Sequence, residues 1–295
     1  EEVWCQLFSE PGAGSDLASL ATRAERDGDE WVVSGQKVWT TWAHLADFGV
    51  LLARTDPDAP KRRGITYFLL DLRQPGVDVR PLRHIGGEVD FNEVFLDRAR
   101  LPDAQRVGDV GDGWRVAGAT LSGERQMVSG SGSGGVDRIG GSGAARLVGA
   151  ARALSAAGRP GGWDDPVVRQ RIVGLLSEER IRDWTNQRVR AGLKAGRAPG
   201  PESSIGKVHQ GGLNQRIQLA ATDLLGPGAT AWSAGGDGYA DDLPYEVRGM
   251  LRSRANTIEG GTTEVNRNIV AERVLGLPRE PDPWRDTPWR DVPRS

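Results

Sequence analysis

The pattern of apolar residues changes character near Leu101-Pro102, and this change limits the folds that the chain can adopt. Before it, short runs rich in Val, Ile, Phe and Trp are separated by turn pairs, at 20–24, 30–34, 48–55, 65–72 and 91–96. Such regular spacing is typical of a small barrel or sandwich. After it, apolar residues such as Trp114, Ala117 and Leu121 recur at helical spacing. The sequence therefore predicts an α+β protein, with a small β-barrel or sandwich domain at 1–103 and a C-terminal domain of four-helix-bundle type at 104–295.

Start and stop signals divide the helical part. Asp165-Pro166 predicts the beginning of a long helix over 167–190, because acidic residues and proline favour a first turn. Ser203-Ser204 begins a second helix, which Gly226-Pro227-Gly228 ends, and a last helix follows Gly261-Thr262. By composition, 129–135 looks like a flexible linker; the alternative is that this Gly/Ser run weakens or kinks a helix that continues through it. The Trp residues of the Pro-interrupted tail either pack on a neighbouring subunit or belong to a disordered end.

Within the β region, Asp27-Gly28 and Ser34-Gly35 are both hairpin signals. The basic run 61–63 is predicted to be a solvated loop. We expect His84, which follows Arg83 in a loop, to be a surface residue.

Composition excludes several classes of function. A formal net charge of −2 and a pI near 6.0 over 295 residues give no electrostatic reason to expect nucleic acid or a membrane surface as a partner. No apolar run reaches the ~18 residues of a membrane span, and no signal peptide opens the chain. The single cysteine, Cys5, suits a reducing cytoplasm and is predicted to serve packing. We therefore expect a cytoplasmic protein, and no motif predicts a metal site.

The most informative turn is the stretch 9–16, Ser-Glu-Pro-Gly-Ala-Gly-Ser-Asp. Pro11 fixes one backbone angle, while Gly12 and Gly14 can take positive φ without a Cβ penalty, so a sharp turn with exposed amides is expected. Such a turn can hold an anion or the edge of a cofactor. The segment 31–41 follows, with an aromatic residue and two hydroxyls at its end.

The segments EPGAGSD and GDEWVVSGQKVWTT resemble the middle domain of the acyl-CoA dehydrogenase flavoproteins. The resemblance continues through FNEVFLDRARLP and VGDVGDGWRVAGATLSGER to TIEGGTTEVNRNIVAERVLGLPR, in the family's order and over nearly the whole chain. It implies an FAD-dependent enzyme that converts an acyl-CoA to the 2-enoyl-CoA. It also implies an electron-transferring flavoprotein as electron acceptor and a homo- or hetero-oligomer. The family's N-terminal helical domain is absent, so the sequence is either a fragment or one of two polypeptides.

The resemblance also assigns residues to the cofactor and the substrate. Contacts to the flavin ring fall on Phe8, Ser9, Trp39 and Thr41, with Gly14 and Ser15 lining the same turn. Thr262 and Glu264 align with residues that touch FAD beyond the ring, and the substrate contacts are Ser15 and Arg125. Two of these residues have plain structural alternatives: Trp39 as core filler and Thr262 as a helix N-cap.

The chain departs from the family at two places. Gly260 stands where many members carry their catalytic glutamate, so we predict Glu124, rather than the adjacent Glu259, as the base. The usual Arg-x-Phe-Gly segment is replaced by 158–163, and either Arg159 or Arg169 could substitute for its arginine. Two alternatives to the dehydrogenase stay open: a non-catalytic or truncated partner subunit, and an acyl-CoA oxidase of the same fold.

Overall fold

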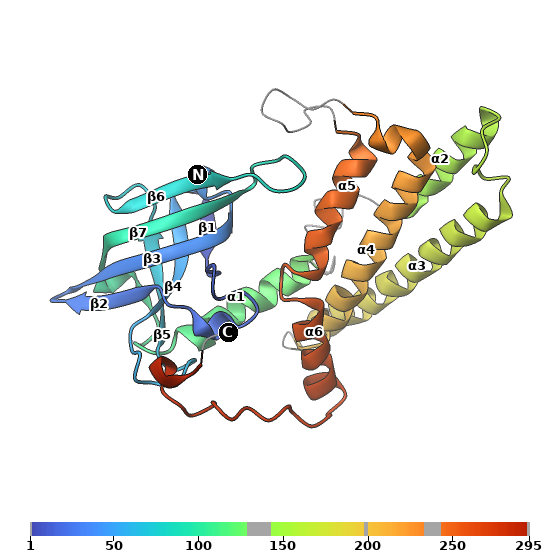
Figure 1. The fold of residues 1–295 in the computed structure, drawn as a ribbon. Helices are drawn as coiled ribbons and strands as arrows, with labels where there is room; N and C mark the ends of the chain where they lie inside the picture. The colour runs from blue at the N-terminus through green and yellow to red at the C-terminus, as the bar shows by residue number, and fades with distance from the viewer. Residues whose placement is uncertain (1, 129–142, 198–199, 233–242, 294–295) are drawn as a thin grey trace. The chain divides into compact units, whose positions relative to one another are not determined.

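The computed structural model describes residues 2–128, 143–197, 200–232 and 243–293, and Figure 1 shows the fold. Contacts divide the chain into a β unit, Glu1–His84, Glu88–Thr120 and Glu280–Ser295, and a helical unit, Ile85–Gly87 and Leu121–Arg279. The predicted α+β class is confirmed. The predicted division into 1–103 and 104–295 differs from this grouping over 85–87, over 104–120 and over the tail.

The β unit is built on one mixed sheet of eight strands (Figure 1). The strands are β1 (Trp4–Leu7), β2 (Arg23–Asp27), β3 (Glu30–Thr41), β4 (Phe48–Arg54), β5 (Ile65–Asp71), β6 (Val77–Leu82), β7 (Phe91–Pro102) and β8 (Arg106–Val107). Their order is β6-β7-β3-β2-β4-β5-β8, with β1 paired to β4 off this path. β1 and β2 pair with β4 in parallel, and the other pairs are antiparallel.

Strand β3 runs unbroken through Ser34-Gly35, so the hairpin predicted at this pair is wrong. Gly35 lies instead at an irregularity in the pairing with β7. A Cβ atom on Gly35 would lie 2.3 Å from Thr22 Oγ1. Glycine is therefore required here by the close approach of a neighbouring chain segment and not by a turn.

The Asp27-Gly28 hairpin is confirmed, because Asp27 pairs with Glu30 across a two-residue loop in which Gly28 has a φ of 63°. Strand β6 was not predicted. Its apolar positions are interrupted by Pro81, which has no backbone N–H to donate and is tolerated in an edge strand such as β6.

The core of the β unit is a cluster of buried side chains from most of the strands, including Leu7, Val33, Leu51, Phe68, Leu70, Val94 and Leu101. Burying one Leu, Val or Phe side chain contributes roughly 1.5–3 kcal/mol to folding. Trp31 packs against Phe68 with ring centroids 5.5 Å apart, and its indole N–H donates to Asp103 at 2.8 Å. Four of the apolar runs read from the sequence thus lie in the core strands β3, β4, β5 and β7, whereas the run 20–24 overlaps β2 only at 23–24.

The principal helices are α1 (Gly113–Val128), α2 (Ala145–Ala156), α3 (Pro166–Lys194), α4 (Ser203–Leu225), α5 (Tyr245–Ser253) and α6 (Thr263–Ile269), which continues as a π-helical turn (Val270–Val274). Shorter 3-10 turns lie at Leu17–Ser19, Ala43–Leu45, Asp103–Gln105, Gly226–Thr230, Arg254–Thr257 and Trp289–Asp291. No described helix has both the length and the apolar character that crossing a bilayer requires. The linker predicted at 129–135 lies outside the described residues.

Local signals place the helix ends as predicted. Asp165 caps α3, because its carboxylate accepts the Val167 N–H at 2.8 Å and Pro166 occupies the first turn. Helix α4 ends at Gly226, which has a φ of 64°. Within the helical unit, α4 packs against α2, α3, α5 and α6, as Figure 1 shows for the long helices.

The centre of the helical unit is partly polar. Lys207 of α4 is fully buried and donates to the Asn256 carbonyl at 2.6 Å. Asn214, about two turns further along α4, donates to the Asn256 side chain at 2.6 Å. These buried hydrogen bonds tie the segment after α5 to α4 and set the position of the turn that leads into α6.

The tail, residues 280–293, belongs to the β unit. Trp289 donates its backbone N–H to Ala59 at 3.0 Å and its indole N–H to the Ser19 carbonyl at 3.2 Å. The Arg54 guanidinium lies 4.8 Å from the centroid of the Trp289 ring. The sequence left two possibilities for the tail Trp residues, packing on a neighbouring subunit or a disordered end. Neither describes Trp289, because Trp289 packs on the β unit of its own chain.

Candidate functional site

The turn predicted to bind a cofactor edge is closed by two backbone hydrogen bonds between Glu10 and Ala13, at 3.0 and 3.1 Å. Gly12 and Gly14 do not have positive φ, so that part of the prediction is wrong. Nothing lies within 4 Å of a Cβ built on either glycine. Both are exposed, and the chain itself therefore leaves open space over the turn, into which a ligand could approach the backbone.

A buried carboxylate within this turn pairs with a buried ammonium group of β3. Glu10 is 8 % exposed and Lys37 of β3 is 0 % exposed, and the Lys37 ammonium donates to Glu10 Oε1 at 2.8 Å. Burial by itself raises the pKa of Glu10, but the charge and hydrogen bond of Lys37, together with the hydrogen bonds from Ala21 and Thr22, outweigh it and leave that pKa below its ordinary value. Burial lowers the pKa of Lys37, and the Glu10 carboxylate opposes that shift. The lowered pKa keeps Glu10 ionised near neutral pH, and the 2.8 Å contact with this carboxylate favours the ammonium form of Lys37.

The turn is joined to the end of β3. The Val38 N–H donates to the Ser9 carbonyl at 3.0 Å, and Phe8, which precedes Ser9, is buried and meets Tyr67 edge-on. The structure thus brings Phe8 and Ser9, predicted from one segment, next to Trp39, predicted from another.

Trp39 and Thr41 are exposed because the sheet is irregular here. The pairing of β3 with β7 shifts between Lys37 and Thr40, and Trp39 has a φ of 59°. A left-handed bulky residue costs about 1–3 kcal/mol and is found mostly at functional sites. The bulge turns the Trp39 side chain outward, 54 % exposed, so the alternative of a plain core filler is wrong.

Asn92 supports the bulge and was not predicted from the sequence. Its side chain is fully buried, donates to the Thr40 carbonyl at 3.0 Å and lies 3.0 Å from His44 Nδ1. A buried asparagine in a strand costs free energy unless it is hydrogen-bonded. Its place in the apolar run 91–96 is the signal that could have identified it.

In the helical unit, Thr262 is the N-cap of α6 and its hydroxyl accepts the Val265 N–H at 3.2 Å. Glu264 lies exposed in the first turn. Two successive glycines, Gly260 and Gly261, precede them with φ of 63° and 83°. Asn266, also missed from the sequence, is fully buried and donates to the carbonyls of Gly261 and Thr262 at 2.8 and 3.0 Å. The capping interpretation of Thr262 is therefore confirmed.

Of the two candidate bases, the structure describes the side-chain contacts of Glu259 only. Glu124 and Arg125 lie in α1, in a stretch whose side chains are outside the described part of the structure. Glu259 accepts from Arg252 at 3.0 Å and from Asn256 at 2.9 Å. Its carboxylate is therefore engaged in an ion pair with a structural role. Of the two arginines considered for the pyrophosphate, Arg169 donates to the Trp163 carbonyl at 3.0 Å.

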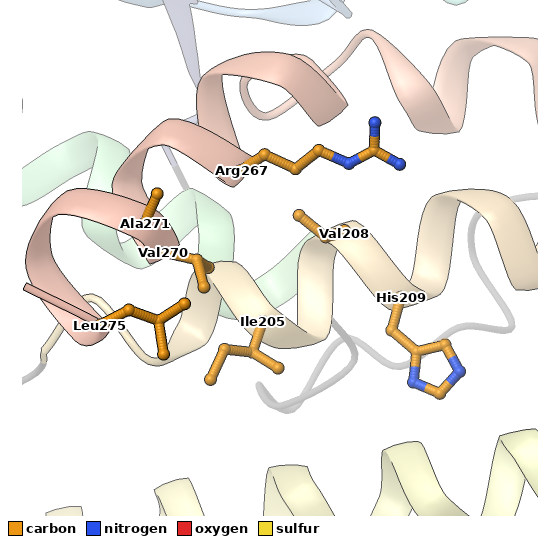
Figure 2. A pocket seen from close by; sticks show the side chains of 7 residues that line it. All are labelled: Ile205, Val208, His209, Arg267, Val270, Ala271 and Leu275. Atoms are coloured by element: carbon orange, nitrogen blue, oxygen red, sulfur yellow. The ribbon is translucent and has the colours of Figure 1, made fainter. Parts of the chain in front are cut away.

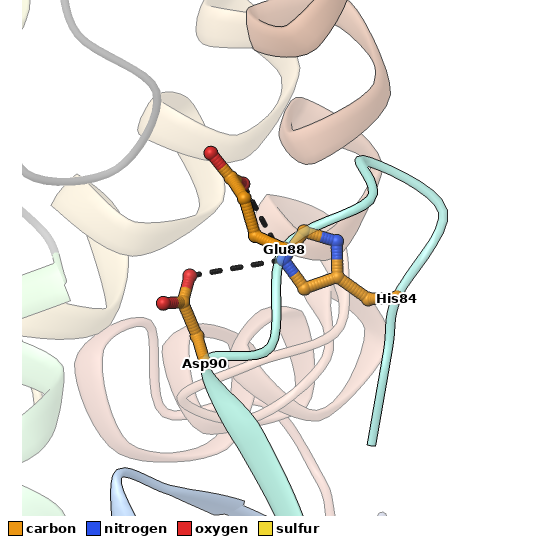
Figure 3. Close-up of side chains that lie close together, drawn as sticks. All are labelled: His84, Glu88 and Asp90. Atoms are coloured by element: carbon orange, nitrogen blue, oxygen red, sulfur yellow. Dashed lines mark ion pairs between the residues drawn. The ribbon is translucent and has the colours of Figure 1, made fainter. Parts of the chain in front are cut away.

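A cluster with metal-ligand geometry lies in the loop after β6 (Figure 3). His84 Nε2 lies 3.5 Å from Glu88 and 3.7 Å from Asp90, and the His84 side chain is only 8 % exposed. The predicted surface position of His84 is therefore wrong, since its ring packs against Phe91 at 5.8 Å. An ion pair accounts for these distances equally well, and we assign no metal to the cluster.

An apolar hollow of about 460 Å³ lies between α4 and the segment from α6 to the π-helical turn (Figure 2). Its lining residues are Ile205, Val208, His209, Arg267, Val270, Ala271 and Leu275. Arg267 and His209 are the polar side chains at its edge. None of the residues that the sequence assigned to cofactor or substrate lines this hollow.

Two family models match the chain. The model of the acyl-CoA dehydrogenase middle domain matches residues 5–99, and that of the acyl-CoA dehydrogenase C-terminal domain matches 111–275. The first overlaps most of the β unit and contains every β-unit residue assigned to the flavin. The second contains Glu124, Glu259, Thr262 and Glu264.

Individual relatives agree with the family models. Acyl-CoA dehydrogenase IpdE1 of Mycobacterium tuberculosis is 43 % identical over 95 % of this chain and 68 % of its own length. Acyl-CoA dehydrogenase FadE34 of the same organism is 41 % identical over 95 % of this chain, which spans only 36 % of that protein. The solved Tcur3481-Tcur3483 steroid ACAD superposes with a TM-score of 0.79 at 29 % identity, covering 95 % of this chain and 69 % of the solved chain.

Proposed function

Because the chain belongs to the acyl-CoA dehydrogenase family, a family of oxidoreductases, we propose that it uses FAD to convert an acyl-CoA thioester to the 2-enoyl-CoA. The observation that carries this proposal is the joint between Ser9 and Val38. It sets the Ser9 turn beside the exposed Trp39, so that two segments predicted to contact one flavin ring meet in one unit.

The residues present fit a flavin. The open space over Gly12 and Gly14 leaves room for the cofactor edge, and the exposed Trp39 offers an apolar face for stacking. When bound, FAD would supply the acceptor for the hydride that leaves the β carbon. Phe8, Ser9, Trp39 and Thr41 would hold the ring, with Gly14 and Ser15 beside it. Thr262 and Glu264 would contact the cofactor beyond the ring.

The proton chemistry would belong to Glu124. A carboxylate must accept the α proton at hydrogen-bond distance while the thioester carbonyl is held by donors. Glu259, the alternative, already accepts from Arg252 and Asn256, and this engagement supports the assignment to Glu124. Ser15 and Arg125 would bind the CoA part of the substrate.

We place the substrate among acyl-CoA thioesters, with a steroid acyl-CoA as the first compound to test, because the solved relative carries the description steroid ACAD. An electron-transferring flavoprotein would reoxidise the cofactor. We further propose a homo- or hetero-oligomer, as the two-part name of that relative suggests for it. The single, buried Cys5 supports a cytoplasmic setting.

The visible spectrum of the purified chain after incubation with FAD tests the proposal. A flavin band that bleaches on anaerobic addition of an acyl-CoA is the expected result. A panel of straight-chain, branched and steroid acyl-CoAs then identifies the substrate class by the rate of bleaching. Rapid return of the band in air with formation of peroxide would instead make the chain an oxidase.

A second candidate is a non-catalytic partner subunit. It is favoured by Gly260, which stands at the usual glutamate position with a φ of 63°, a backbone conformation that a glutamate rarely adopts. A chain that binds no flavin, or binds it without bleaching by any acyl-CoA, would support this candidate over the first.

A further inference from the structure

We propose that Lys37 and Glu10 are positioning residues that fix the two walls of the flavin-ring site, the Ser9 turn and the Trp39 bulge, relative to each other. The proposal rests on the proposed function for its link to flavin. Neither residue is assigned a role by the resemblance to the family that the sequence shows.

The Lys37 ammonium joins three segments of the β unit. It donates to the Phe8 carbonyl at 3.0 Å and to Glu10 Oε1 at 2.8 Å. The Glu10 carboxylate in turn accepts the N–H groups of Ala21 at 2.7 Å and Thr22 at 2.9 Å. Ser9 therefore lies between two residues that are both held by one ammonium group.

Lys37 is also fixed to the second wall by the chain itself. The next residue, Val38, donates to the Ser9 carbonyl at 3.0 Å, and the residue after it is Trp39 with its left-handed backbone. The bulge between Lys37 and Thr40 thus begins at the lysine. A shift of Lys37 would move Ser9 and Trp39 together or apart.

Stability alone does not account for such a pair. Removing two charges from water costs about as much as their attraction returns, and well-packed apolar residues often serve as well. A buried pair does supply directed hydrogen bonds, which apolar side chains lack. Since Lys37 is 0 % exposed and Glu10 is 8 % exposed, the pair makes its contacts with the chain and not with solvent.

The decisive variant removes both charges. Lys37→Met alone leaves a buried carboxylate without its cation and can fail to fold. The double variant Lys37→Met/Glu10→Gln keeps the volumes and leaves no unpaired charge. Phe68→Leu is the matched control, because Phe68 is fully buried in the same sheet and its substitution lowers stability without touching the turn.

Two measurements on the full chain test the pair. Hydrogen exchange of the Val38 amide, followed by NMR without flavin, reports the joint to Ser9. Fluorescence titration with FAD reports the dissociation constant. In the double variant we expect the hydrogen-exchange rate of the Val38 amide to be at least about tenfold higher than in Phe68→Leu. We expect the FAD dissociation constant to be higher by at least about the same factor. We also expect a shifted flavin band.

A folded double variant that matches the control in both measurements would overturn the inference. A double variant that does not fold would assign the pair a purely structural role and would overturn it as well. If the parent chain binds no FAD, the proposed function fails, and the exchange rate at Val38 then decides alone whether the pair positions the turn.

Discussion

The Trp39 indole meets the ring of Phe91 edge-on, with centroids 5.6 Å apart and ring planes at 80°. Phe91 thus supports one side of a tryptophan that the bulge turns outward. We expect Trp39→Ala to lose about 1–3 kcal/mol of flavin affinity, or roughly 5- to 160-fold in dissociation constant, because a stacking surface is removed. Titration with FAD measures this. Trp4→Ala is the control, since Trp4 is 44 % exposed and stacks on Phe48. Equal affinity in parent and Trp39→Ala would place the ring elsewhere.

The base assignment makes a kinetic prediction. Glu124→Gln should slow flavin reduction by an acyl-CoA by orders of magnitude, because an amide cannot accept the α proton. Glu259→Gln should mainly lower thermal stability, since Glu259 holds Arg252 and Asn256. Rapid mixing measures the reduction rate and a melting curve the stability. The reverse pattern, with Glu259→Gln slow and Glu124→Gln at the parent rate, would show that Glu259 is the base.

Some features of the fold were predictable because short local signals determine them. Asp165-Pro166 and Gly226 set the ends of helices through the conformation of one or two residues, and those predictions hold. Ser34-Gly35 carries the same kind of signal, yet the chain continues as β3 because Thr22 packs directly over Gly35. A dipeptide cannot reveal which segment will lie above it.

The candidate site likewise contains residues that could be predicted from the sequence and residues that could not. Trp39 and Ser9 belong to recognisable segments and were predicted. Lys37 was not, because a charged residue in a strand normally marks the solvent face, and its partner Glu10 is 27 positions away. The outward turn of Trp39 depends on a shift in pairing with β7, which the alternation of residues within β3 does not encode.

Thr262 has a measurable role as a cap. Thr262→Ala should cost roughly 0.5–2 kcal/mol of stability, because the Val265 N–H loses its acceptor, while Thr262→Ser should keep most of it. Chemical denaturation measures both variants. FAD titration of the same pair then separates the two roles: affinity lost in Thr262→Ala and kept in Thr262→Ser would support a contact with the cofactor. Unchanged affinity in both would limit Thr262 to capping.

Cys5 should be nearly inert in the folded chain. Burial raises the pKa of its thiol to about 12, and the thiolate is the reactive form. At pH 8 we expect a colorimetric disulfide reagent to react with the native chain at least about a hundredfold more slowly than with the denatured chain. Rapid labelling of the native chain would show that β1 opens readily.

Acid should destabilise the β unit through Glu10. Its folded pKa lies below the ordinary value of 4.5, so its contribution to stability is complete above that pH and is lost as the pH falls through the folded pKa. The free energy of unfolding should therefore fall with pH below about 4.5. This part of the slope should be missing in Glu10→Gln. Denaturation curves from pH 3 to 7 measure it, and equal slopes would contradict the assignment of a lowered pKa.

The docking of Trp289 on the β unit has a consequence for how the chain is made. The indole of Trp289 reaches the Ser19 carbonyl across 270 positions of sequence, and Arg54 lies beneath its ring. A ribosome delivers Ser19 and Arg54 before the helical unit and must translate all of that unit before Trp289 emerges. The strands of the β unit are therefore synthesised without this partner, and Trp289 can dock on them only after the helical unit has been translated.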